Sequence, residues 1–341
     1  MSHDVTDKPA VPSPVRANRR TRRARRNRRW LSSAALVGAV GVGAPLAMMT
    51  SPGSAGAATA PTVSGYTLVN SSGGVFDFGT APSVGGILGQ SNSPVVGIAP
   101  DPTGKGYWVA TANGGVYSVG DAKFYGSAGN MTIKAPIVAI VATNDGGGYY
   151  LVGADGGVLT FGDAKFYGSA GNLTLTSPIV GLSVTSDGAG YYLVGADGGV
   201  FTFGDAVFAG TLSSTFGGPS PDGPAVGIAA DPTGPGYLIA TAEGAIVSYG
   251  GAPFYGSPAL NGVTPNAPLV SVTYAPDGTG YWAVGADGGV FTFNASVTSG
   301  TGSSSTLVTT GTAKFFGSVP GELGAAGIAI PDNVVGIAPT L

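Results

Sequence analysis

Aspartates recur through this sequence with a regularity that could support chemistry. A ring of carboxylates could bind Ca²⁺, a cation that prefers oxygen ligands, and two carboxylates held about 5–10 Å apart could hydrolyse a glycosidic bond. Two sets of carboxylates stand beside or near glycine. The first is Asp101, Asp145, Asp187, Asp231 and Asp277, accompanied by Asp121, Asp163 and Asp205; the second is Asp155, Asp197 and Asp287, with Glu243 at the equivalent position of one repeat.

The same aspartates fit a simpler role as turn residues. An aspartate beside glycine forms tight turns because its carboxylate accepts hydrogen bonds from nearby backbone N–H groups. The sequence lacks the dense D-x-D-x-D-G spacing of a calcium loop. We therefore interpret these aspartates as turn residues and expect neither a cofactor nor a metal, with Ca²⁺ binding as the alternative.

Several other chemistries lack their residues. The sequence has no cysteine, its only histidine is His3, and its last arginine is Arg29. Beyond that point, disulfides, cysteine or histidine zinc sites, Ser-His-Asp and Cys-His pairs, and arginine clamps are excluded. Carboxylate pairs remain, but nothing in the spacing marks one pair. We expect no catalytic residues and no enzyme, with a carboxylate-dependent glycoside hydrolase as the remaining enzymatic alternative.

Residues 1–60 have the order of an export signal. A polybasic stretch, Arg16–Trp30, precedes nineteen uncharged residues, Leu31–Met49, which we expect to be helical. Small residues follow, and an A-x-A pattern ends at Ala57, where we expect cleavage. The alternative is an uncleaved anchor, because nineteen residues could span a bilayer. Either interpretation places residues 61–341 outside the cytoplasm, secreted or at the cell surface or cell wall.

The composition beyond residue 60 limits the partners. Five lysines, no arginine and sixteen acidic residues give this part a formal charge of −11. Such a charge repels nucleic acid and anionic lipid, so we expect neither, and membrane contact only through an uncleaved leader. The whole chain is 43% hydrophobic and has 61 glycines, which excludes classical disorder and indicates many tight turns.

A repeat of 41 to 46 residues runs through this part of the chain. It is marked by the dipeptide Gly-Tyr, and each unit has four runs of strand-forming residues separated by turn residues. Units of this length with four strands are typical of β-propellers. The Gly-Tyr pairs begin at Gly65, Gly106, Gly148, Gly190, Gly236 and Gly280.

The four expected strands of a unit differ in character. The first follows a proline in five of six units, as at Val95–Pro100, and alternates small with branched residues, which suits the crowded centre of a ring. The second begins at the Gly-Tyr. An Asp-Gly pair such as Asp197-Gly198 leads into the third and predicts a two-residue type I′ turn. The fourth is the KFYGS stretch, Lys123–Ser127 and its equivalents.

The phase of the repeat predicts a closed ring. The first unit begins at its second strand, with Gly65, whereas the chain ends on a first strand, Val334–Pro339. A C-terminal strand that pairs into the first unit would complete both ends and leave no open sheet edge. The fold class is therefore all-β, a six-bladed β-propeller of four-stranded blades closed by the C-terminal strand.

Two features could carry recognition. The last unit contains an insertion, Asn294–Thr310, whose Ser, Thr and Gly content predicts a surface loop. We expect interaction residues there because the repeat does not explain this segment. The candidates are Asn294, Ser296, Thr298, Ser303, Ser304 and Thr309.

The repeated aromatic pairs are the second feature. Rings such as Tyr191-Tyr192, and the Phe-Tyr of the fourth strand, could stack on sugars. Consecutive residues on a strand point to opposite faces, and both faces of a blade pack against neighbours. We therefore interpret the aromatic residues as core between blades, with sugar binding as the alternative.

The repeat unit resembles those of a known group of proteins. GYYLVGADGGVFTFGDA, FYGS and P-x-V-G-I-A look like the propeller-type repeats of secreted and cell-wall-associated bacterial proteins, with a layout similar to the NHL and YVTN propellers. The resemblance covers residues 62–341. It implies an exported scaffold, and we expect its partner to be a protein or glycan at the cell surface. We expect a monomeric, non-catalytic binding module, with a carbohydrate-binding propeller as the alternative.

Overall fold

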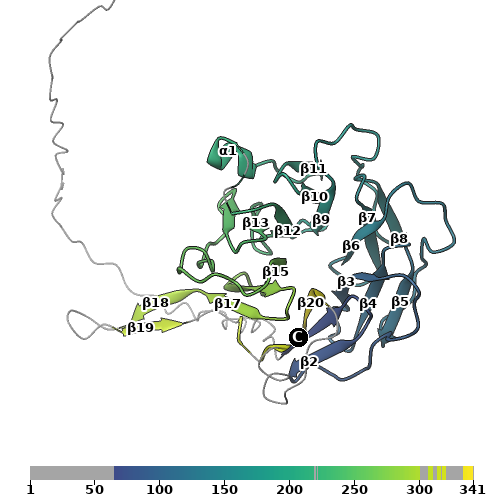
Figure 1. Cartoon of the computed structure of the whole chain (residues 1–341), viewed down its shortest axis with the longest axis horizontal. Helices are drawn as coiled ribbons and strands as arrows, with labels where there is room; N and C mark the ends of the chain where they lie inside the picture. The colour runs from purple at the N-terminus through teal and green to yellow at the C-terminus, as the bar shows by residue number, and fades with distance from the viewer. Residues whose placement is uncertain are drawn as a thin grey trace, which may run out of the picture. The chain divides into compact units, whose positions relative to one another are not determined.

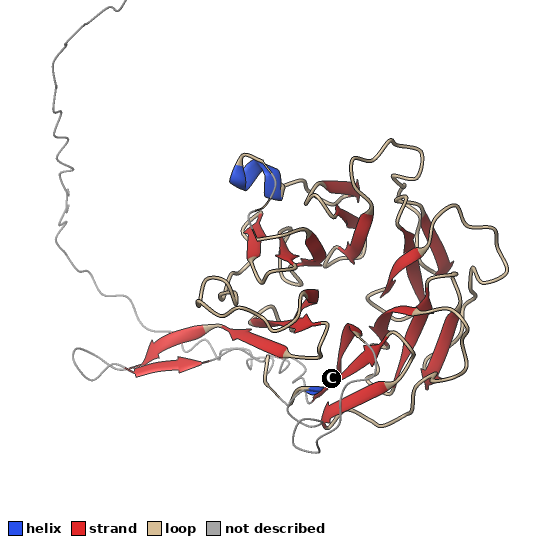
Figure 2. Cartoon of the chain, in the orientation of Figure 1, coloured by secondary structure: helices blue, strands red, loops and turns tan. Residues whose placement is uncertain are grey.

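The computed structural model describes residues 65–218, 220, 222–299, 306–309, 313–315, 317–319 and 333–340. These residues form six three-stranded antiparallel sheets, one two-stranded sheet and one short helix, α1 (Leu212–Phe216). The six sheets lie around a common centre (Figures 1 and 2). No helix in these ranges is long and apolar enough to cross a membrane. The fold is all-β and propeller-like, and the expected export signal lies outside the described residues.

Each of the six sheets contributes one inner strand to the centre. These strands contact one another in cyclic order, so that the last in sequence meets the first. Their bounds confirm the ranges expected from the sequence, with one further residue in the last. The inner strands are β3 (Val95–Pro100), β6 (Ile137–Ala142), β9 (Ile179–Val184), β12 (Ala225–Ala230), β15 (Leu269–Tyr274) and β20 (Val334–Thr340).

The middle strand of each sheet is buried along its whole length, because both of its faces meet neighbouring sheets. The outer strand of each sheet is less buried. The middle strands are β1 (Gly65–Asn70), β4 (Gly106–Thr111), β7 (Gly148–Gly153), β10 (Gly190–Gly195), β13 (Tyr237–Thr241) and β16 (Gly280–Gly285); the outer strands are β2 (Val75–Gly79), β5 (Val116–Gly120), β8 (Val158–Gly162), β11 (Val200–Gly204), β14 (Ile246–Tyr249) and β17 (Val290–Asn294).

The two ends of the repeat region meet in one sheet. Strand β20 pairs antiparallel with β1, from Gly65 opposite Thr340 to Asn70 opposite Val334. This sheet has the order β2-β1-β20, which is the pairing predicted from the phase of the repeat. Leu68 and Ile337 are opposite each other and both are buried.

Small residues allow the inner strands to approach one another closely. A Cβ atom at Gly336 would lie 3.2 Å from a side-chain carbon of Ile98, and one at Gly97 would lie 3.5 Å from the backbone nitrogen of Ile140. Larger side chains at these positions would separate the strands. The alternation of small and branched residues therefore has the role that the sequence suggested.

The expected fourth strand is not a strand. The stretches that follow five of the six outer strands, all but β2, are called the outer segments here, and residues 123–127 and their equivalents have no regular secondary structure. The glycine of their FYGS sequence has a positive φ, for example +128° at Gly126 and +137° at Gly168, which interrupts an extended ladder. The blades are therefore three-stranded where four strands were expected. The outer segments are residues 123–127, 165–169, 207–211 and 253–257, with the described residues among 313–319.

Tyrosine hydroxyls hold the outer segments in place of a ladder. The Tyr191 hydroxyl, on the next sheet, donates to Gly168 O at 2.6 Å and accepts from Tyr167 N at 3.2 Å. Burial raises the pKa of Tyr191, so the hydroxyl stays protonated at neutral pH. The Tyr66 hydroxyl donates to Gly317 O at 2.5 Å and accepts from Gly317 N at 3.2 Å, across the seam between the first and last sheets. Each such tyrosine links two sheets.

Indole groups hold the same segments from within a sheet. Trp108 Nε1 donates to Lys123 O at 2.8 Å, and Trp282 Nε1 donates to Lys314 O at 2.9 Å. Both tryptophans are fully buried, as are Tyr191 and most other aromatic residues of the middle strands. This confirms that the middle-strand aromatic residues are core.

The turn between middle and outer strands differs from the predicted type I′. Gly198 N donates to Gly195 O at 2.8 Å, and Gly195 N donates to Gly199 O at 2.9 Å, which encloses a three-residue loop. Gly198, with φ of +75°, follows the turn. The loop is thus a three-residue turn closed by a left-handed glycine, and an Asp-Gly pair fits it as well as it fits a two-residue turn.

Candidate functional site

The insertion in the last repeat forms a β-hairpin, where a loop was expected. Strand β17 ends at Asn294, and β18 (Ser296–Ser299) begins after one residue and pairs antiparallel with β19 (Thr306–Thr309). In Figure 1 the hairpin extends from β17 away from the common centre. Its β-branched residues favour strands. No other sheet contains an equivalent hairpin within the described residues.

The six predicted interaction residues have different positions. Ser296 is opposite Thr309, and Thr298 is opposite Leu307, so three of the predicted residues lie on the hairpin strands. Ser303 and Ser304 lie outside the described residues. The sixth residue, Asn294, is at the base of the hairpin.

Asn294 supports the hairpin from inside. It is half-buried, and its Nδ2 donates to Ala313 O at 2.6 Å. The bond joins the residue before the insertion to a residue after it. Asn294 is therefore better explained as an anchor of the hairpin than as a group that contacts a ligand.

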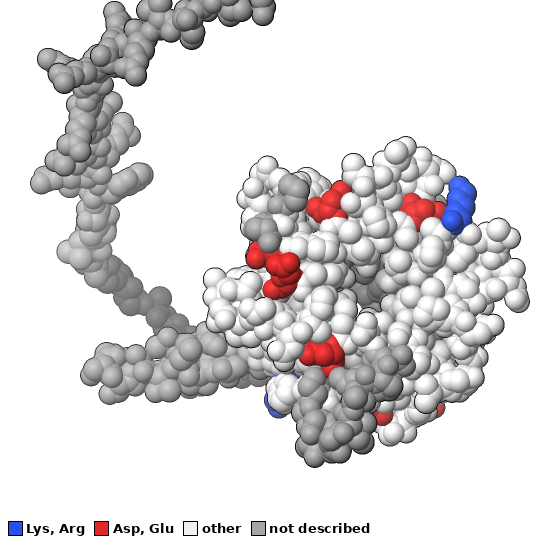
Figure 3. Space-filling view, viewed as in Figure 1, with Lys and Arg blue, Asp and Glu red and all other residues white. Residues whose placement is uncertain are grey.

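The recurring aspartates make turns, as the sequence indicated. Asp101 Oδ1 accepts from Thr103 N at 2.9 Å, and Asp231 Oδ1 accepts from Thr233 N at 2.8 Å. The second set follows the same rule, since Asp197 Oδ1 accepts from Gly199 N at 3.0 Å. In Figure 3 the acidic side chains of one face form separate patches rather than a continuous cluster. Within the described residues, no three acidic or histidine side chains are grouped so as to hold a metal ion.

Two pairs of carboxyl groups do come together, which the sequence did not reveal. The Thr143 hydroxyl lies within hydrogen-bond distance of Asp145 Oδ1, at 2.8 Å, and of Asp163 Oδ1, at 3.3 Å. In the next sheet the Thr185 hydroxyl joins Asp187 and Asp205 in the same way, at 2.8 and 3.4 Å. Hydrogen bonds from Ala189 N and the Thr185 hydroxyl lower the pKa of Asp187, whereas partial desolvation and the neighbouring Asp187 carboxylate raise the pKa of Asp205.

These pairs are unlike those of a glycoside hydrolase. In each pair both carboxylates accept from the same threonine hydroxyl, whereas retaining and inverting enzymes place their two carboxyl groups on either side of the bond that is cleaved. Both groups of the pair Asp187 and Asp205 are exposed. The turns between inner and middle strands and those after the outer strands therefore share one face, without forming a catalytic geometry of that kind.

Calcium should have little effect on the melting of this protein. The carboxylate oxygens that would bind the cation already accept backbone N–H groups, for example Gly147 N at Asp145 and Gly199 N at Asp197. We expect the same melting midpoint, measured by circular dichroism, with added CaCl₂ and with a chelator. A rise in midpoint with Ca²⁺ that is lost in an Asp197→Ala variant would contradict the assignment of these residues as turn formers.

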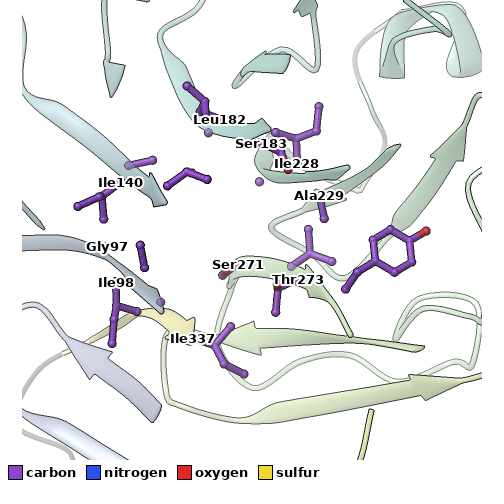
Figure 4. A pocket seen from close by; sticks show the side chains of 18 of the residues that line it. Gly97, Ile98, Ile140, Leu182, Ser183, Ile228, Ala229, Ser271, Thr273 and Ile337 are labelled. Carbon is purple, nitrogen blue, oxygen red and sulfur yellow. The ribbon is translucent and has the colours of Figure 1, made fainter. Parts of the chain in front are cut away.

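A cavity of about 330 Å³ lies between the inner strands. Figure 4 shows Gly97, Ile140, Leu182, Ile228 and Ile337 around it. Its lining is apolar except for a few hydroxyl groups, and the described residues that line it include no charged side chain. Such a lining offers no general acid or base at neutral pH. The cavity was not predicted, because it depends on how far the inner strands stand from the axis.

The phenylalanines of the outer segments are exposed, which corrects their assignment to the core. Their exposed fraction ranges from 41% for Phe254 to 61% for Phe166. In three of the segments the next residue is a half-buried tyrosine, so the two rings point to opposite sides and the phenyl ring faces solvent. The result is one exposed ring on each of five sheets: Phe124, Phe166, Phe208, Phe254 and Phe315.

The likeness of this chain to known proteins is structural. No family model matches it, and no curated protein matches it. Among solved structures, one chain from a crystal structure of a nidogen/laminin complex superimposes with a TM-score of 0.48 and 10% sequence identity, covering 81% of this chain and 98% of that one.

Proposed function

We propose that this chain is an exported, non-catalytic, six-bladed β-propeller that serves as a binding scaffold outside the cytoplasm, and that the β18–β19 hairpin makes its specific contact. The observation that carries the proposal is the hairpin itself. Six sheets repeat one plan, and the hairpin is the largest departure from that plan. A repeated framework that positions one variable element is a common arrangement for recognition.

Three further observations support the proposal. The cyclic contacts of the inner strands and the pairing of β20 with β1 fit a closed propeller. The apolar lining of the central cavity and the turn-forming aspartates fit a protein without catalysis. The basic and apolar leader, residues 1–60, fits export.

Deleting residues 294–310 should remove binding and leave the fold intact. The deletion joins Phe293 to Gly311 and restores the short connection of other repeats, in which Phe161 and Phe203 are each followed directly by Gly-Asp-Ala. We expect the free energy of unfolding to change by less than about 1 kcal/mol, because shorter loops cost less entropy to close. The partner should be captured from a surface extract of the producing cells by the full chain and not by the deletion variant.

A matched control changes another irregular segment. Replacing Ser213 and Thr215 of α1 by alanine alters exposed polar side chains on a different sheet while leaving the hairpin unchanged. This variant should capture the same partner as the full chain. Capture that survives deletion of the hairpin would overturn the proposed contact.

A carbohydrate-binding propeller is a second candidate, favoured by the exposed phenyl rings. Aromatic faces of this kind can stack on sugars, and the five rings recur at equivalent places as a repeating polysaccharide would require. The same capture experiment separates the two candidates. A polysaccharide retained by both the full chain and the hairpin deletion would favour this second function, and a protein retained by the full chain alone favours the first.

A further inference from the structure

The hairpin strands have open edges. Within the described part of the chain, β18 and β19 pair with each other and with no third strand. The other strands are joined to a neighbouring strand, packed into the ring of inner strands, or flanked by the outer segments. An unpaired strand edge presents a row of N–H and C=O groups that can pair with another chain.

This hairpin lacks the features that protect an edge from pairing. Its strands read SVTS and TLVT, with no charged residue and no proline. Lysine, glutamate and proline are the residues by which exposed edges resist association. An isolated two-stranded hairpin is at best marginally stable in water and gains stability from a third strand.

A second copy of the same hairpin meets the geometric requirement. Two identical strands pair antiparallel about a two-fold axis only in registers that place a residue opposite its own copy. With Leu307 opposite its copy, Thr306 is opposite Val308 on both sides; with Val308 at the centre, Leu307 is opposite Thr309. Both registers place β-branched or leucine residues opposite each other, which are favourable cross-strand pairs.

Charge also favours contact through the hairpin. The chain beyond residue 60 carries a formal charge of −11, so two copies repel each other when their bodies approach. The hairpin strands are uncharged and extend from β17 away from the centre (Figure 1). Pairing at the hairpin therefore joins two copies at the place where repulsion is weakest.

We propose that two copies of this chain associate through β19, whose open edge pairs antiparallel with β19 of the second copy to form a four-stranded sheet. The proposal rests on the function proposed above, in which the hairpin is the contact element, and it names a second copy as the partner. It replaces the monomer expected from the sequence.

A single cysteine tests the register directly. The chain has no cysteine, so Leu307→Cys and Val308→Cys each introduce one thiol into the full chain. Residues opposite each other on antiparallel strands have Cα atoms about 4.5–5.5 Å apart, within the range of a disulfide. We expect one of the two variants to form a disulfide-linked dimer under mild oxidation, and Leu173→Cys, at a 57% exposed leucine in the connection between β8 and β9, to stay monomeric.

Sedimentation velocity provides the second measurement. The full chain should show a monomer–dimer equilibrium that Leu307→Lys weakens by about tenfold or more, because a charge on the edge opposes pairing. Leu173→Lys should leave the equilibrium unchanged. A full chain that is monomeric at all concentrations, or a dimer that is insensitive to Leu307→Lys, overturns the inference. If the hairpin deletion still abolishes capture of another protein in that case, the proposed function stands and only the identity of the partner is wrong.

Discussion

A chain that ends at Asn333 is expected to lose cooperative folding. Strand β20 supplies the inner strand of the first sheet and contacts the inner strands β3 and β15 on either side. Its Val334, Ile337 and Ala338 are buried. Burial of a valine or isoleucine side chain is worth about 1.5–3 kcal/mol. The truncation removes these buried side chains and six backbone-paired positions along β1. The free energy of folding that is lost therefore approaches the roughly 5–15 kcal/mol that stabilises a whole domain.

Urea unfolding followed by tryptophan fluorescence measures this effect, because Trp282 packs beside the seam against Tyr66. We expect the truncated chain to lack the cooperative transition of the full chain. A synthetic peptide of residues 334–341, added in excess, should restore the transition by mass action, whereas the same peptide carrying Ile337→Asp should not. A truncated chain that unfolds at the same urea concentration as the full chain would show that β20 does not close the ring.

The deletion of residues 294–310 is the matched comparison for the truncation. It removes more residues than the truncation does, yet it takes away only the hairpin and its connections. We expect the truncation to destabilise the chain strongly and the longer deletion to change its stability little. That result would show that β20 is needed for folding and that the hairpin is not. Reversed effects would mean that the hairpin, rather than β20, supports the ring.

The inner strands were predictable because their signals are local. A proline before each of five strands sets the start, and the alternation of small and branched residues sets which residues face the crowded centre. The pairing of β20 with β1 was predictable for a different reason. An incomplete first repeat and an incomplete last repeat complement each other, and only their pairing removes both open edges.

The outer segments were not predictable because tertiary contacts decide their form. KFYGS has the composition of a strand, but its glycine adopts a φ that ends the ladder, and a tyrosine from the next sheet replaces the missing backbone bonds. Nothing in the sequence near Gly168 indicates that a tyrosine of the next sheet will bond to it. Phe166 is exposed and Tyr167 is half-buried, so the two rings do alternate; Phe166 is not core because its face of the outer segment meets solvent and not a neighbouring sheet.

The turn role of the aspartates was predicted from the sequence, whereas the hairpin formed by the insertion was not. An aspartate two residues before its N–H donor is a local pattern, and Asp197 and its equivalents form the predicted turns. The hairpin was mistaken for a loop because serine, threonine and glycine dominate its composition. The β-branched runs around Val297 and Val308 were the available signal, and they are short enough that pairing between them decides the structure.

Gly168→Ala is expected to destabilise the protein by roughly 2–4 kcal/mol, the sum of a strained backbone and an overpacked core. Gly168 has φ of +137°, which side chains rarely adopt, and a Cβ atom there would lie 2.6 Å from Cδ1 of Phe203 on the next sheet. Gly168 is also the residue whose carbonyl accepts the Tyr191 hydroxyl. Any shift that relieves the clash therefore weakens the bond that joins the two sheets. Urea unfolding of the full chain measures the change.

Gly85→Ala separates the two contributions. Gly85 also has a positive φ, +84°, but a Cβ atom there would meet nothing within 4 Å. This control should lose only about 1–2 kcal/mol, the usual cost of a left-handed conformation for alanine. Tyr191→Phe, which keeps the ring and removes the hydroxyl, should lose about 1–3 kcal/mol because it leaves two half-buried backbone groups without their partner. Equal effects of Gly168→Ala and Gly85→Ala would show that contact with Phe203 does not constrain the outer segment, and that the sheets are joined mainly through their inner strands.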